Sequence, residues 1–92
     1  MTNSESSSMM PNQAARRILT INTGSSRLKV ALYEAGREET LILSGEAERI
    51  GAPGGRFRLS DALGATLIDQ EGDLPDHGAA LEAALAGLRR YH

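Results

Sequence analysis

The feature that most constrains the fold is a pair of short apolar segments on either side of a Gly-Ser turn. Residues 16–22 read RRILTIN, a short apolar run bounded by turn residues, which predicts a largely buried strand. Residues 27–33 read RLKVALY, and their alternation in period two predicts a strand with one core face. Because only residues 23–26 separate the two segments, we expect a β-hairpin.

A lone hairpin is marginally stable in water, so other elements must complete the core. Apolar residues bounded by glycine-containing turns predict three more strands, over residues 40–50, 56–60 and 65–70. The sequence therefore predicts an antiparallel meander of five strands.

A helix is expected to follow the last strand. Asp76 comes directly after a proline and is placed to cap the first helical turn. The apolar stripe of this helix consists of Leu81, Ala84, Leu85 and Leu88. Gly87 interrupts the helix and is expected to weaken it by up to about 1 kcal/mol relative to alanine. Together the elements predict an α/β fold with one helix after the strands.

Composition limits the size of the core. The chain has 92 residues, of which 40% are apolar and 3% aromatic, so it can bury one small core. We expect residues 1–15, which are polar and serine-rich, to form a disordered leader, and residues 16–92 to form the ordered domain. Met1, Met9 and Met10 remain alternative translation starts.

Charge and cysteine content exclude several classes of partner. Ten basic and twelve acidic residues give a net charge of −2, which does not provide the one-sided basic field expected for nucleic acid or an anionic membrane. The chain has no cysteine, which excludes disulfides and thiolate metal sites. No apolar run approaches the ~20 residues of a membrane span. We expect a cytoplasmic protein without a nucleic-acid or membrane partner.

The residues around the first turn have the chemistry of a phosphate site. Gly24 lets a ligand approach the backbone closely, and Ser25 and Ser26 offer hydroxyl groups beside turn amides. Lys29, the only lysine, lies on the polar side of its strand, and Asn22 offers an oxygen to a hydrated Mg²⁺. The same residues also fit an ordinary Gly-Ser turn. The spacing is not that of a P-loop.

Three segments resemble the acetate kinase family. Residues 18–34, ILTINTGSSRLKVALYE, are similar to its N-terminal signature, in which a strand runs into N-x-G-S-S-S-L-K. Residues 48–51, E-R-I-G, and residues 73–77, D-L-P-D-H, resemble two later family segments in the same order. The likeness covers about residues 16–91. Arg27 departs from the pattern because the family usually has serine there, and its effect on the phosphate pocket stays open.

The resemblance implies both fold and activity. It implies the opening of a ribonuclease-H-like, actin-like ATPase fold with an incomplete sheet. It also implies reversible, Mg²⁺-dependent transfer of the ATP γ-phosphoryl group to acetate or another short carboxylate, giving acetyl phosphate and ADP. Lys29, Gly24, Ser25 and Ser26 match the family's ATP-phosphate residues, and Asn22 matches its Mg²⁺-associated asparagine.

The family enzyme is several-fold longer, and the resemblance places its catalytic and carboxylate-binding residues after residue 92. We therefore expect no catalytic residue within this chain, no turnover by the chain alone, and either a homo-oligomer (the family forms homodimers) or a missing C-terminal part. Acetate is the acceptor that the resemblance implies, and propionate and butyrate remain open.

Two smaller expectations concern the later segments. His77 is expected to help seat the helix, and Arg49 to pair with Glu46 or Glu48. Two alternatives to the kinase also remain. One is a non-catalytic phosphate- or partner-binding module derived from the same fold, and the other is an unrelated small β-rich domain.

Overall fold

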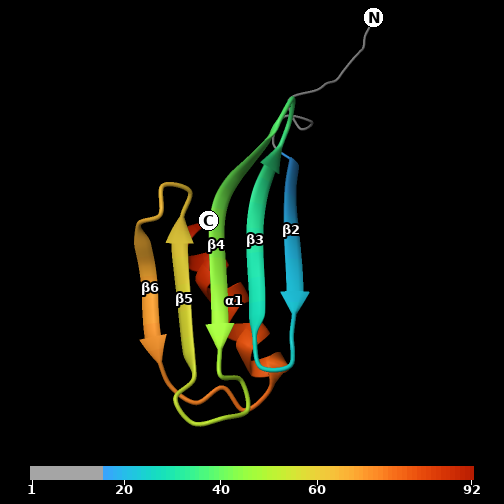
Figure 1. Ribbon diagram of the computed structural model, residues 1–92. Coiled ribbons are helices and arrows are strands. Elements are labelled where there is room, and N and C mark those ends of the chain that lie inside the picture. The colour runs from blue at the N-terminus through green and yellow to red at the C-terminus, as the bar shows by residue number, and fades with distance from the viewer. Residues whose placement is uncertain (1–15) are drawn as a thin grey trace, which may run out of the picture.

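A computed structural model describes residues 16–92 as one sheet and one helix (Figure 1). The elements are β2 (Arg16–Thr23), β3 (Leu28–Ala35), β4 (Glu39–Glu48), β5 (Arg56–Asp61), β6 (Thr66–Glu71) and α1 (His77–Tyr91). The sheet is antiparallel throughout, and its spatial order β2-β3-β4-β5-β6 is also the chain order. This confirms the predicted meander followed by one helix. The expected leader, residues 1–15, lies outside the described residues.

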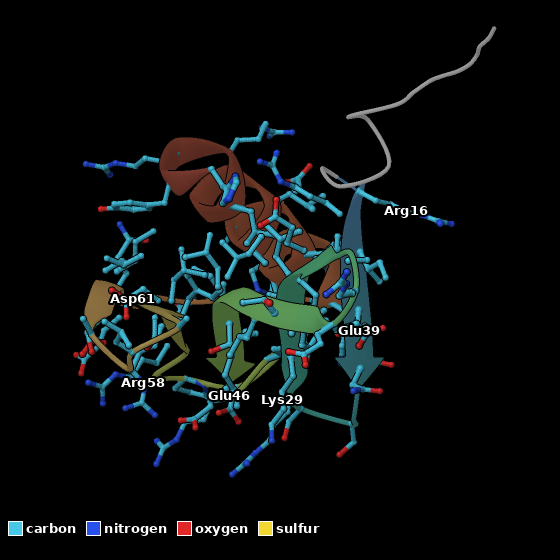
Figure 2. All side chains as sticks on the ribbon, turned by 90° about the horizontal axis from the view of Figure 1, so that it is seen from above. Arg16, Lys29, Glu39, Glu46, Arg58 and Asp61 are labelled. Carbon is cyan, nitrogen blue, oxygen red and sulfur yellow. The ribbon has the colours of Figure 1, made fainter. Side chains whose placement is uncertain are left out.

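The helix covers one face of the sheet, and the two faces differ accordingly. Alternate residues of β3, β4 and β5 point toward α1 and form the core. The buried residues are Leu28, Val30, Leu43, Ala47, Ile50, Phe57, Leu59, Ala80, Ala84 and Leu88. Figure 2 shows Lys29, Glu46 and Arg58 on the opposite, uncovered face. Within residues 16–92, no helix is long and apolar enough to cross a membrane.

The helix begins where the sequence predicts. Asp76 is its N-cap, and the Asp76 carboxylate accepts a hydrogen bond of 2.8 Å from the Ala79 amide. The buried side of the helix is shifted from the predicted stripe. Ala80, Ala84, Gly87 and Leu88 are buried, whereas Leu81 and Leu85 are half-buried and pack against the core.

Gly87, expected to weaken the helix, has a packing role in this structure. A Cβ added there would lie 3.1 Å from Cδ1 of Ile68 and 3.4 Å from Cδ2 of Leu59. The missing side chain therefore lets α1 approach the sheet closely, which offsets part of the cost of glycine in a helix.

The prediction that β2 is largely buried is wrong. Ile18 is half-buried and the other seven residues of β2 are exposed, with Leu19 at 38% and Ile21 at 45%. The cause is position: β2 is an edge strand that pairs only with β3, and α1 lies over β3, β4 and β5. A groove between β2 and the C-terminal part of α1 results, lined by Arg17, Leu19, Leu32, Leu85, Leu88, Arg89 and His92.

Candidate functional site

The β2–β3 hairpin brings all five predicted site residues together. Its loop is closed by the Gly24 amide, which donates a hydrogen bond of 2.8 Å to the Arg27 carbonyl. Immediately beside the loop, Asn22 and Lys29 are direct cross-strand partners. Such partners have Cβ atoms about 4.5–5.5 Å apart on the same face. The face is the one opposite α1, where the Lys29 side chain points away from the helix (Figure 2).

The loop peptides are held by their carbonyls. The Gly24 carbonyl lies 2.6 Å from Nε2 of His77, and the Ser26 carbonyl accepts a hydrogen bond of 3.0 Å from the Ile50 amide. By contrast, the Ser25 and Ser26 amides donate no hydrogen bond to a backbone carbonyl of residues 16–92. A Cβ built on Gly24 would meet no atom within 4 Å. The loop thus presents amide donors and an open approach, the arrangement of a backbone anion site.

The three segments that carry the sequence resemblance meet at this end of the sheet. The β2–β3, β4–β5 and β6–α1 connections all lie there (Figure 1). The hydrogen bond from the Ile50 amide to the Ser26 carbonyl joins the β4–β5 connection to the β2–β3 loop. The contact of His77, at the start of α1, with the Gly24 carbonyl joins the β6–α1 segment to the same loop. A third bond, of 2.6 Å from the Gly51 amide to the Leu74 carbonyl, joins those two connections to each other. We call this closed set of three hydrogen bonds the loop ring.

Comparison with known proteins identifies the family of this chain. A model of the acetokinase family matches residues 17–92. The chain belongs to the acetokinase family. Acetate kinase of Desulforamulus reducens is 44% identical over 68 residues, which are 74% of this chain and 17% of that protein. Acetate kinase of Streptomyces coelicolor is 36% identical over 77 residues, 84% of this chain and 19% of that protein.

A solved acetokinase has the same arrangement of elements. The crystal structure of Porphyromonas gingivalis acetate kinase superimposes with a TM-score of 0.69 at 32% identity, over 78% of this chain and 18% of that one. This match confirms the predicted opening of an actin-like, ribonuclease-H-like fold. The chain spans less than a fifth of the length of these three relatives.

Arg27, the departure from the family pattern, forms an ion pair on the uncovered face. Its guanidinium lies 3.3 Å from the Glu46 carboxylate. Glu46 is also the direct cross-strand partner of Lys29. Within residues 16–92, Lys29 has no carboxylate within 4 Å. Arg27 thus pairs with the acidic side chain that lies opposite Lys29.

The expected pairing of Arg49 is wrong. Glu46 pairs with Arg27, and Glu48 lies 3.7 Å from the guanidinium of Arg58, a diagonal neighbour on β5. Arg49 instead follows the end of β4 with a φ of +57°, a left-handed conformation that is uncommon for a residue with a side chain. It turns the chain into the β4–β5 connection that contributes to the loop ring.

The described residues do not form a separate metal site. No three His, Asp or Glu side chains of residues 16–92 gather closely enough to hold an ion. Asn22 carries one amide oxygen beside the loop, and Lys29 is its cross-strand partner. This donor set fits a Mg²⁺ that takes its other ligands from phosphate and water, as this ion usually does.

Sequence reasoning found the hairpin residues and missed what holds them. His77 and Ile50 contact the loop, although 53 and 24 residues separate them from their partners. Local patterns do not encode such contacts. One signal could have indicated these contacts: Ile50 and His77 belong to residues 48–51 and 73–77, the two later segments that resemble the family.

Proposed function

We propose that residues 16–92 supply the phosphate-facing part of the ATP site in an acetate-kinase-type phosphotransferase. The observation that carries this proposal is the hairpin, in which Asn22 and Lys29 are cross-strand partners beside a loop whose Ser25 and Ser26 amides have no backbone acceptor. The reaction would join a carboxylate oxygen of acetate, or of another short carboxylate, to the γ-phosphorus of ATP. The bond from that phosphorus to the bridging oxygen breaks, and ADP leaves.

Each hairpin group has a physical task in such a transfer. Phosphoryl transfer depends mostly on positioning and charge neutralisation. Lys29 would place one positive charge against the phosphates, and the Ser25 and Ser26 amides with the two serine hydroxyls would donate hydrogen bonds to phosphate oxygens, beside Gly24. The lack of atoms near Gly24 leaves room for a phosphate at the backbone.

Asn22 would contact the Mg²⁺ that accompanies the nucleotide. When bound, that ion neutralises phosphate charge. Asn22 has an uncharged amide oxygen, so it can contact the ion or its water shell and forms no ion pair with Lys29. This arrangement allows the ammonium and the metal to face the same phosphates.

The proposal treats the chain as one part of a larger catalytic unit. The relatives extend far beyond the matched segment, and we expect the catalytic residues to lie outside residues 16–92. We therefore expect no acetyl phosphate from the purified chain above blank. We propose that the complete catalytic unit acts in the cytoplasm, as a homo-oligomer, on ATP and a short carboxylate.

The decisive experiment is a chimera. Residues 16–92 replace the matched segment of the Desulforamulus reducens acetate kinase, and acetyl phosphate formation is measured with acetate, propionate and butyrate. We expect activity, and we expect Lys29→Ala to lower kcat/KM for ATP about ten- to a hundredfold, the value of one charge-assisted contact. Arg58→Ala, which removes a cation from the same face away from the loop, is the control. A folded, inactive chimera that still binds polyphosphate would favour the non-catalytic binding module.

A second experiment tests the loop within the 92-residue chain. Gly24→Ala and Gly36→Ala are matched, because a Cβ at either glycine meets no atom within 4 Å. Neither variant should change thermal stability appreciably. Isothermal titration with inorganic tripolyphosphate should show weaker binding only for Gly24→Ala. Equal binding by the two variants would remove the loop from the proposed site.

A further inference from the structure

His77 is the only side chain in the loop ring; the other five groups are backbone amides and carbonyls. Its Nε2 lies 2.6 Å from the Gly24 carbonyl oxygen. A carbonyl oxygen can only accept, so Nε2 must carry the proton and donate it. His77 is the first residue of α1, directly after the N-cap Asp76, so the helix fixes its backbone.

The Gly24 carbonyl belongs to the same peptide unit as the Ser25 amide. A peptide unit is planar, and in the trans form its C=O and N–H point in opposite directions. Residues 16–92 contain no cis peptide bond. A donor that holds the Gly24 carbonyl toward α1 therefore turns the Ser25 N–H away from α1, toward the outside of the loop.

The peptide unit between Ser26 and Arg27 is oriented in the same way. The Ile50 amide holds the Ser26 carbonyl, which turns the Arg27 N–H outward. The loop thus has two carbonyls drawn inward and two amides directed outward. One of these two orientations is set by the Ile50 backbone amide, and the other by the His77 side chain, which substitution can change without altering the backbone.

We propose that His77 is a positioning residue, whose hydrogen bond to the Gly24 carbonyl orients the Ser25 amide toward the phosphates of the nucleotide. The proposal rests on the proposed function of the hairpin. It assigns His77 no contact with substrate. A hydrogen bond to the carbonyl also polarises the peptide, which strengthens its N–H as a donor.

The test separates the hydrogen bond from helix stability. His77→Phe keeps a flat ring and removes the donor, whereas His77→Gln keeps an N–H at similar reach. Asp76→Ala is the structural control, because it weakens the helix cap without touching the Gly24 carbonyl. All three are made in the 92-residue chain, labelled with ¹⁵N and ¹³C, and their thermal unfolding is recorded.

The first readout needs no ligand. In the free chain, His77→Phe should shift the NMR signals of the Gly24 carbonyl and the Ser25 amide, and His77→Gln should restore most of the shift. Asp76→Ala should lower the melting temperature and leave both signals near their original positions. Unchanged signals in a folded His77→Phe chain would overturn the proposal, whether or not any phosphate binds.

The second readout is affinity for inorganic tripolyphosphate. We expect His77→Phe to weaken binding about three- to tenfold, the value of one hydrogen-bond donor. His77→Gln should retain most of the affinity, and Asp76→Ala all of it. Equal losses in His77→Phe and Asp76→Ala would reduce His77 to a structural role. Failure of the unsubstituted chain to bind would instead overturn the proposed function, and the ligand-free spectra would still decide whether His77 orients the peptide.

Discussion

The helix-facing side of the sheet has two unlike halves. Over β4 and β5, Ala47 and Leu59 have no exposed surface, and small helix residues pack directly against them. Over β2, Leu19 and Ile21 keep 38% and 45% of their surface exposed, although they are no less apolar. We call these the closed half and the open half. The difference comes from the position of the helix over the sheet, and not from the apolar character of the strands.

The comparison shows how the candidate site is held. Asn22 lies on β2, the strand that core packing stabilises least. The hairpin loop is instead fixed from outside the strand, by His77 and Ile50. Fold stability and site geometry therefore have different physical sources, and substitutions should separate them.

The largest effect should come from a leucine of the closed half. Leu59→Ala removes a fully buried side chain and should cost about 2–5 kcal/mol. A core of this size rarely supplies more than about 3–5 kcal/mol in total. We therefore expect the variant to be largely unfolded by circular dichroism at 25 °C.

The matched change in the open half is Leu19→Ala. That side chain is already 38% exposed, so its loss should cost less than about 1 kcal/mol in a urea titration. Similar losses in the two variants would mean that something covers β2 in solution and that the open half does not persist.

The exposed apolar surface of the open half also predicts self-association of the chain. An edge strand with exposed apolar side chains favours pairing between copies of the chain. We expect the 92-residue chain to self-associate at high concentration, and Ile21→Lys to weaken this association at least about tenfold, because edge lysines oppose strand pairing. Sedimentation velocity over a concentration series measures the effect.

The control for this change is Ala86→Lys, which adds the same single positive charge on the exposed side of α1. If both lysine variants dissociate the oligomer equally, general charge repulsion and not the open half explains the result.

The same contrast marks how far the sequence could predict the structure. The alternation around Leu28 and Val30 and the capping residue Asp76 are local signals, and each led to the correct element. The exposure of β2 could not be predicted, because an apolar run shows that a strand can be buried and not what covers it. The hydrogen bond of His77 to Gly24 spans 53 residues, so it depends on how separate loops meet.

The smallest effect should come from the uncovered face. Arg56 on β5 holds the Asp69 carboxylate of β6 through two hydrogen bonds, of 2.8 and 2.7 Å. Both side chains are more than a third exposed, so solvent screens the pair. Asp69→Asn should therefore stay folded at 25 °C, unlike Leu59→Ala, and its melting temperature should fall only slightly, with Glu82→Gln as a control for loss of an exposed carboxylate.

The dependence of this effect on pH follows from the direction of the shift. The hydrogen bond from Arg56 holds the pKa of Asp69 below its usual range. A carboxyl group with a lowered pKa in the folded state stabilises the fold above its unfolded pKa of about 3.9. That contribution is lost as the pH falls through the lower, folded value. The difference in melting temperature between the original chain and Asp69→Asn should thus stay constant from neutral pH to about pH 5, and disappear in stronger acid. A difference that grew on acidification would show that Asp69 does not act through its charge.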